Sequence, residues 1–205
     1  MHLRKTIVFG LSFGLGFVVV LLSLWAFSIA RIYFFPVSEQ ALVVVLPSPT
    51  PDLTPATLII PKLNITSAVE RVGLTATNNM DVPKDASHVA WYMHGPKPSE
   101  AGSAVIAGHY DTATGRPAIF YDLSKLEKGD ELEVISENAV RSIFVVTRKD
   151  RIAYDTLPKE ELFTTTSEKQ LNLITCGGIW DSKRKTYSER IVVYTILKSS
   201  LNEAI

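Results

Sequence analysis

The sequence contains a single cysteine, so no disulfide can form within the chain. Small secreted domains usually depend on disulfides, and a domain without them has to rely on its hydrophobic core. Acidic and basic residues balance at 21 each, so there is no global basic field of the kind that nucleic-acid binding requires. The one thiol, Cys176, also excludes most zinc sites built on cysteine pairs.

The sequence also lacks the glycine-rich loops that hold phosphates. Neither G-x-x-x-x-G-K-[ST] nor G-x-G-x-x-G occurs, and no segment repeats. These absences argue against a nucleotide-dependent enzyme or a repeat protein, and we predict no cofactor. At 205 residues the chain has room for one domain and an anchor, but not for two ordinary domains.

One long uncharged stretch stands out near the N-terminus. Residues 7–30 form a run of 24 residues without a charge. As a helix this run would span about 36 Å, enough for a hydrocarbon core of about 30 Å. A cleavable signal peptide is the alternative, because the run ends in the small residue Ala30. The apolar part of a signal peptide is only about 7–15 residues long, so we favour an uncleaved transmembrane anchor.

The residues on either side of this run predict its orientation. His2, Arg4 and Lys5 precede it, whereas Arg31 and the aromatic segment Tyr33–Phe35 follow it. The positive-inside rule favours a cytoplasmic N-terminus, and aromatic residues are typical of a membrane interface. We therefore expect a single-pass protein of the cell membrane whose main domain lies outside the cell.

A proline-rich stretch separates the run from the rest of the chain. Prolines recur at every second or fourth position, at Pro47, Pro49, Pro51 and Pro55. They prevent a helix and favour an extended spacer. The predicted organisation is therefore a cytoplasmic N-terminus, an anchor, a linker and a folded domain, at residues 1–6, 7–30, 31–55 and 56–205.

Beyond the linker, short β-branched or alternating segments with turns between them predict a mostly β domain. The expected strands are Thr57–Ile60, Ile65–Val69, Ser103–Ala107, Glu131–Ile135, Ser142–Thr147, Leu171–Thr175 and Ile191–Leu197. Helical signals are confined to Pro158–Leu162 and a turn at Phe120–Leu126. Several short strands of this kind indicate a closed barrel or a sandwich.

Cys176 lies where the apolar strand Leu171–Thr175 is expected to end, immediately before Gly177 and Gly178. On composition alone, a lone thiol is more often an inert buried side chain than a reactive one. A strand end, however, places a side chain at a rim, and two glycines let another backbone approach closely. Cys176 is therefore a candidate nucleophile.

A thiol nucleophile needs partners. Only a few per cent of an ordinary thiol is ionised at neutral pH, and histidine is the usual base. His109, in the segment G-H-Y-D, directly follows a predicted strand, while His88 and His94 are the alternatives. Attack on an amide also needs a donor for the oxyanion, and Arg190 opens the last predicted strand. Taken alone, Arg190 is more simply interpreted as a surface residue.

Taken together, these residues resemble those of the sortase family. The family pattern is a histidine after a glycine, an L-x-T-C strand end and an arginine that opens the next strand. Gly108-His109, Leu173–Cys176 and Arg190 follow this pattern in order. The resemblance runs from about Thr57 to Leu197.

Two further residues refine the resemblance. The T-C-G-G segment, with Asp181 and Tyr187 close behind it, looks most like class F, or class E, of the family. The resemblance implies an all-β, eight-stranded closed β-barrel with a few short helices, preceded by one N-terminal transmembrane helix. The acidic loop cluster that binds calcium in one class has no counterpart here, so we predict no metal.

The resemblance also implies a reaction. Cys176 would attack the Thr–Gly bond of an LPXTG-like C-terminal sorting signal on a secreted protein and form a thioester. An amine, such as a cell-wall precursor or a pilin, would then resolve it. His109 would move protons, Arg190 would hold the substrate and stabilise the oxyanion, and Thr175 would line the substrate groove. The expected partners are these proteins, the amine acceptor and the membrane, for a monomer that binds no nucleic acid.

Three alternatives remain open at this point. A secreted cysteine hydrolase would use water as the acceptor. An L,D-transpeptidase would place its cysteine in an S-H-G-C segment, whereas Cys176 follows Thr175. A tethered β-domain that binds a wall component would not need the thiol at all. Asp111 is also open to two interpretations, because it could orient His109 or cap a turn.

Overall fold

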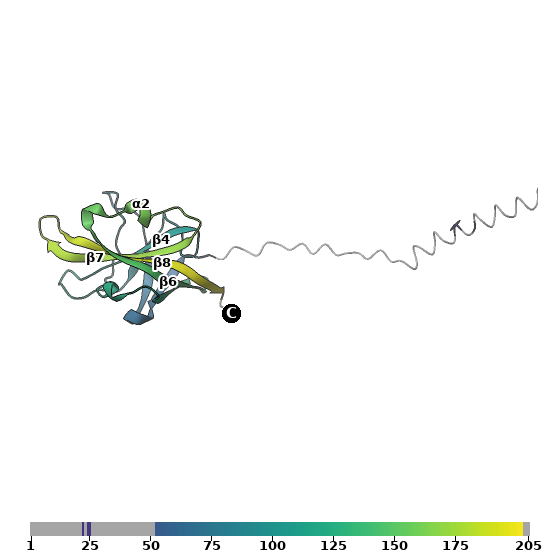
Figure 1. The fold of residues 1–205 in the computed structure, drawn as a ribbon, viewed down its shortest axis with the longest axis horizontal. Coiled ribbons are helices and arrows are strands. Elements are labelled where there is room, and N and C mark those ends of the chain that lie inside the picture. Colours follow the sequence, from purple (N-terminus) through teal and green to yellow (C-terminus); the bar gives the residue numbers. More distant parts are fainter. Residues whose placement is uncertain (1–21, 23, 26–51, 203–205) are drawn as a thin grey trace, which may run out of the picture. The chain divides into compact units, whose positions relative to one another are not determined.

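The structure, a computed structural model, describes residues 22, 24–25 and 52–202 (Figure 1). Nearly all of the predicted anchor and most of the predicted linker lie outside these residues. Among the residues that are described, no helix is long and apolar enough to cross a membrane. The anchor, its orientation and the boundaries of the first three segments therefore stay predictions.

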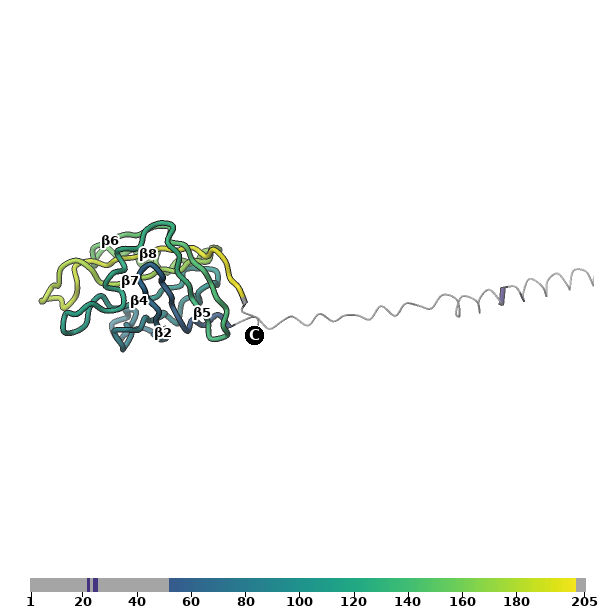
Figure 2. The backbone as a smooth tube through the Cα atoms, turned by 90° about the horizontal axis from the view of Figure 1, so that it is seen from below, coloured from purple at the N-terminus to yellow at the C-terminus, as the bar shows by residue number. Residues whose placement is uncertain are grey.

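Residues 52–202 fold into a closed eight-stranded barrel, in the order β1-β2-β3-β4-β7-β8-β6-β5. Figure 2 shows the strands wrapping around a common interior. The strands are β1 Pro55–Ile60, β2 Ile65–Val72, β3 Val89–Tyr92, β4 Gly102–Gly108, β5 Glu131–Ser136, β6 Val140–Ala153, β7 Lys169–Asp181 and β8 Thr186–Asn202. The prediction of an all-β, eight-stranded closed barrel is confirmed.

Helical structure in residues 52–202 is limited to single turns. Three are 3-10 turns, η1 Pro61–Leu63, η2 Leu123–Lys125 and η3 Tyr154–Thr156, and the fourth is the α-helix α2 Lys159–Leu162. The last two lie in the connection between β6 and β7, and η2 and α2 fall within the predicted helical segments.

The core lies inside the barrel and follows from the alternation of side chains along each strand. In β5, for example, exposed and half-buried residues alternate with the buried Leu132, Val134 and Ser136. Large side chains with no exposed surface, among them Leu58, Ile106 and Phe144, fill the interior. Burial on this scale allows a domain without disulfides to fold.

A second, smaller cluster packs on the outside of the barrel. Leu162 of α2 is buried against Val192 and Tyr194 of β8, with Ile174 of β7 beside them. This contact fixes the connection between β6 and β7 over the outer faces of β7 and β8. It thereby builds one wall of the cleft described below.

Several strands depart from the sequence expectation, among them β3, β7 and β8. The strand β3 was missed, because it is only four residues long and lies between His88 and a polar loop. The strands β7 and β8 are much longer than expected, because they pair with each other along nearly their whole length, out to Trp180 and Tyr187. This pairing stabilises residues whose own sequence carries little strand preference.

Candidate active site

Cys176 and Arg190 form one rung of the β7–β8 ladder, because they are direct partners in the antiparallel register. Side chains opposite each other in such a pair lie on the same face, with Cβ atoms about 4.5–5.5 Å apart. Both residues are half-buried. Since Thr175 and Ile191, their buried neighbours, face the interior, Cys176 and Arg190 face the outside of the barrel.

The expected position of both residues at strand ends is wrong. The strand β7 continues past Cys176 to Asp181, and β8 begins at Thr186, four residues before Arg190. What interrupts the ladder after Cys176 is an irregularity in register between Gly177 and Trp180. The thiol therefore lies next to a bulge inside a long hairpin.

The two glycines after Cys176 allow the backbone to form this bulge. Gly178 has a left-handed φ of 78°, and a Cβ there would lie 2.4 Å from Ser188 Oγ. A Cβ on Gly177 would lie 3.1 Å from the side chain of Ile191. Glycine is required at position 178 because both the backbone angle and the available space exclude a side chain. The sequence argument that these glycines admit a substrate backbone therefore has a competing structural explanation.

His109 reaches the same rung from the neighbouring strand. The strand β4 pairs in parallel with β7, and the last matched pair is Ala107 with Ile174, so His109 follows in step with Cys176. Thr175 Oγ1 donates a hydrogen bond of 2.8 Å to the carbonyl of Gly108, which locks the end of β4 to β7. Thr175 lines the cleft, but its hydroxyl is buried in this bond.

Tight packing fixes the backbone at His109. A Cβ on Gly108 would lie 2.5 Å from the ring of Phe120, so glycine lets the fully buried Phe120 press against the backbone there. The amide of Phe120 donates a 2.9 Å hydrogen bond to the carbonyl of His109. The segment predicted as a turn at 120–126 is therefore the support of the candidate base.

The ring of His109 is oriented by a third segment. Nε2 lies 2.9 Å from the carbonyl oxygen of Pro83, in the connection between β2 and β3. A carbonyl only accepts, so Nε2 carries a hydrogen in this contact and Nδ1 is the nitrogen left for proton transfer. Of the alternatives, His88 pairs instead with Glu70 and lies outside the cleft, while His94 lines the cleft.

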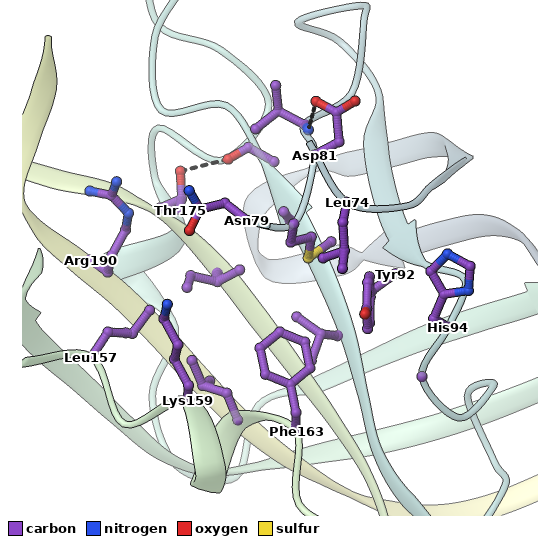
Figure 3. Close-up of a pocket in the computed structure, with 18 of the residues that line it drawn as sticks. Leu74, Asn79, Asp81, Tyr92, His94, Leu157, Lys159, Phe163, Thr175 and Arg190 are labelled. Carbon is purple, nitrogen blue, oxygen red and sulfur yellow. Dashed lines mark hydrogen bonds between the residues drawn. The ribbon is translucent and has the colours of Figure 1, made fainter. Parts of the chain in front are cut away.

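These residues open into one cleft of about 800 Å³. Its lining includes His109, Thr175, Cys176 and Arg190, so the four residues singled out from the sequence converge on one site. Figure 3 shows Arg190 and Thr175 on one side of the cleft and Tyr92 and His94 on the other. The remaining walls come from the loop after β2, from the end of β3 and from the connection that carries α2, including Leu74, Asn79, Leu157, Lys159, Leu162 and Phe163.

The guanidinium of Arg190 is held by its own strand. Nη1 donates to the carbonyls of Tyr187 at 3.2 Å and Glu189 at 2.8 Å, and Nη2 donates to Thr186 Oγ1 at 2.9 Å. The group also lies 4.5 Å from the centre of the Tyr154 ring. An arginine has five N–H donors, so this preorganised cation keeps hydrogens available for a bound carbonyl oxygen.

The environment of Cys176 acts on its acidity in opposing directions. Burial raises the pKa of the thiol above its ordinary value, the positive charge of Arg190 lowers it, and the negative charge of Asp111 raises it. The net effect is a raised pKa, because desolvation of the thiolate is the largest contribution. The protein without substrate therefore holds Cys176 mainly as a thiol at neutral pH.

Asp111 does not hydrogen-bond to His109 in the structure. Its Oδ2 accepts a hydrogen bond from the hydroxyl of Tyr187, 76 residues further along the chain. That bond raises the pKa of Tyr187 to about 12, so the hydroxyl stays protonated and keeps donating. The pair ties the segment that follows His109 to the strand that carries Arg190.

No group of three or more histidine, cysteine or acidic side chains within residues 52–202 is arranged to hold a metal ion. The polar groups that line the cleft include one thiol, one guanidinium and the rings of His94 and His109. This set suits covalent chemistry on an acyl group, with a nucleophile, a proton carrier and an oxyanion donor.

Comparison with known proteins agrees with this interpretation. Residues 58–198 match the sortase domain family. The chain belongs to the sortase family. Family membership makes it a cysteine transpeptidase that acts on sorting signals. A comparison with curated proteins returned no match.

Solved sortase structures share the fold at low sequence identity. Sortase A of Listeria monocytogenes is 16% identical with a TM-score of 0.55, over 75% of this chain and 92% of that one. Sortase C-3 of Streptococcus pneumoniae is 22% identical with a TM-score of 0.55, over 76% and 68%. Sortase D5 of Clostridium perfringens is 19% identical with a TM-score of 0.53, over 71% and 79%. At such identities the likeness shows the fold alone.

Proposed function

We propose that this sortase is a membrane-anchored transpeptidase that cleaves an LPXTG-like sorting signal and joins the new C-terminus to an amine at the cell surface. The observation that carries the proposal is the convergence of His109, Cys176 and Arg190 on one cleft. Within it, Cys176 and Arg190 are fixed as partners on adjacent strands. The residue roles below are part of the same proposal.

The first half of the reaction forms the acyl-enzyme. A proton passes from the Cys176 thiol to Nδ1 of His109, and the sulfur attacks the carbonyl carbon of the threonine in the signal. Arg190 donates to the oxyanion, a preorganised interaction of the kind worth about 2.7–4 kcal/mol in acyl transfer. The C–N bond then breaks, Nδ1 protonates the leaving amine, and a thioester on Cys176 remains.

The second half reverses these steps with a new amine. His109, now neutral, accepts a proton as the amine nitrogen bonds to the thioester carbon. The C–S bond breaks and its electron pair returns to Cys176. The amine outcompetes water when it is bound next to the thioester, because proximity contributes up to about 7–11 kcal/mol to such a step.

The lining of the cleft supports a peptide substrate with apolar residues ahead of the scissile bond. Leu74, Phe163 and Ile174 offer apolar surface, and Lys159 is a polar neighbour in the same wall. A leucine-proline segment followed by a threonine would fit such a wall. Thr175 lies at the base of this groove, where its contact with the substrate would be through the side-chain methyl, since its hydroxyl is bound to Gly108.

We place the enzyme in class F, or class E, because of the T-C-G-G segment with Asp181 and Tyr187 behind it. We further propose that residues 7–30 anchor it in the cell membrane with the catalytic domain outside the cell. This placement rests on the uncharged run of 24 residues and on the charges that precede it. A tether of this kind would keep the enzyme close to secreted proteins that carry a sorting signal and to a membrane-bound acceptor.

An assay with two substrates tests the proposal. The full chain is supplied with an LPXTG-type peptide, with and without a primary amine, and the products are analysed by mass. We expect cleavage between threonine and glycine and a new amide when the amine is present. If hydrolysis alone occurs at saturating amine, the transpeptidase proposal fails and a cysteine hydrolase replaces it.

A further inference from the structure

Asp111 carries a negative charge whose effect on Cys176 is unfavourable for the proposed reaction. It lies close enough to Cys176 for its charge to raise the pKa of the thiol, which works against formation of the nucleophile. It does not orient His109, whose Nε2 is bound to Pro83. A carboxylate that opposes the first step contributes to catalysis only if it serves another step.

The position of Asp111 relative to the cleft indicates which step this is. The cleft is lined by Ile174, Thr175, Cys176 and Arg190 from β7 and β8, and no residue between 177 and 189 contributes to its lining. Tyr187, which holds Asp111, lies in that outer part of the hairpin, opposite Trp180. The Asp111–Tyr187 pair therefore sits beyond the end of the cleft, past the reactive rung.

A transpeptidase needs a binding site for its acceptor amine, and the side of Cys176 where the Asp111–Tyr187 pair lies is the place for it. The acyl part of the substrate remains in the cleft after the first half-reaction, so the leaving amine departs from the opposite side of Cys176. The acceptor amine has to approach the same carbon from the place that the leaving amine vacated. Most primary amines are ammonium ions at neutral pH and are attracted by a carboxylate and by aromatic faces.

The surroundings of Asp111 offer both attractions. One carboxylate oxygen accepts from Tyr187, and within residues 52–202 the other, Oδ1, has no hydrogen-bond partner. The Tyr187 ring is flanked by Tyr110 and Trp180, with ring centres 5.4 Å and 5.3 Å away, and Trp180 is 52% exposed. Arg151, a nearby cation, is paired with Glu189.

We propose that Asp111, held in place by Tyr187 and bordered by Tyr110 and Trp180, is the binding subsite for the ammonium form of the acceptor amine. The inference rests on the proposed transpeptidase function and adds the residues that select the second substrate. The bound ammonium gives one proton to solvent and becomes an amine. Its second proton passes to His109 as the N–C bond forms and the C–S bond breaks.

A competition between two acceptors in one reaction tests the subsite. The full chain receives an LPXTG-type peptide with triglycinamide, which is cationic at neutral pH, and hydroxylamine, which is not. The readout is the ratio of the triglycinamide product to the hydroxylamine product. For Asp111→Asn we expect this ratio to fall about fivefold, the size of a single exposed ion pair. The asparagine oxygen still accepts from Tyr187, so the link between the two segments is retained.

Two comparisons complete the test. Asp122→Asn, the same change at an exposed carboxylate paired with Lys125, should leave the ratio at the wild-type value. For the wild type, added salt should lower the ratio, because it screens the attraction for the cation only. If Asp111→Asn slows both acceptors equally, or leaves the ratio unchanged, the subsite is disproved while the transpeptidase function stands. If the wild type forms neither product, both proposals fall.

Discussion

The two sides of the candidate active site are held in different ways. Cys176 and Arg190 are partners in the longest hairpin of the barrel, so the β7–β8 ladder alone sets their spacing. His109 lies just past the end of β4 and is held by two contacts from loops, with the carbonyl of Pro83 and the amide of Phe120, while Thr175 bonds to the preceding Gly108. Cys176 and Arg190 are thus positioned by regular structure, whereas the ring and backbone of His109 are held mainly by loop residues.

This difference predicts that substitutions on the two sides of the site affect activity and stability differently. A ladder hydrogen bond is supported by its neighbours, while a loop contact has few substitutes. Changes under His109 should therefore reduce activity before they unfold the barrel. Changes to the Cys176–Arg190 rung should act through chemistry, because the register itself is fixed by many pairs.

The largest expected effect is the loss of His109, the proposed proton carrier. His109→Ala should lower kcat/KM by about 10²–10⁴-fold, the usual contribution of a general acid–base. The assay is cleavage of an LPXTG-type peptide. His88→Ala, at a ring that pairs with Glu70 outside the cleft, is the matched control and should stay within a few-fold of wild type. The reverse order of the two variants would contradict the assignment of His109.

The next effect tests the other side of the comparison. Arg190→Lys keeps the charge but loses the planar fork that donates to Thr186, Tyr187 and Glu189. We expect kcat to fall by about 10²–10³-fold with little change in thermal stability. Arg184→Lys, at an exposed arginine in the same hairpin, should have no effect. Full activity of Arg190→Lys would show that geometry at the oxyanion does not matter.

A smaller effect is expected from the support beneath His109. Gly108→Ala places a methyl group 2.5 Å from Phe120 and should destabilise the fold by about 1–3 kcal/mol. Activity should fall at temperatures where the protein is still folded, because the backbone of His109 is displaced. Gly73→Ala, whose methyl meets the ends of the His94 and Met93 side chains at 3.3 Å and 3.6 Å, is the control. Equal melting temperatures for both variants would contradict the packing argument.

The pH dependence of Cys176 should show the opposing charges directly. Its raised pKa means that the thiolate forms only at higher pH. The midpoint of the pH profile for alkylation by iodoacetamide should therefore lie above that of an ordinary thiol, about 8.5. Arg190→Gln removes a positive charge and should shift the midpoint upward, whereas Asp111→Asn should shift it downward. Shifts in the same direction for both variants would exclude this electrostatic account.

Much of the fold was predictable from sequence because the strands carry strong local signals. Segments such as Glu131–Ile135 and Leu171–Thr175 lie inside the observed strands β5 and β7. The short strand Val89–Tyr92 was not predictable, since it depends on parallel pairing with β2. The lengths of β7 and β8 were underestimated for a similar reason, because distant pairing rather than local preference extends them.

The sequence indicated the candidate site residues, whose roles stay a prediction, but not their arrangement. Cys176, His109 and Arg190 were identified from their neighbours in sequence, and the cleft brings them together. Which histidine follows in step with Cys176 depends on the register between β4 and β7, which no local pattern encodes. The bond between Asp111 and Tyr187 joins residues 76 positions apart and had no signal in sequence beyond the two residues themselves.

The most direct test of the central claim is to trap the acyl-enzyme. The full chain is mixed with an LPXTG-type peptide without added amine, quenched in acid, and its intact mass is measured. We predict a mass increase equal to the peptide up to its threonine, located on Cys176 and released by hydroxylamine. The Cys176→Ala variant should show neither the adduct nor cleavage. Cleavage by that variant, or an adduct on another residue, would contradict the account.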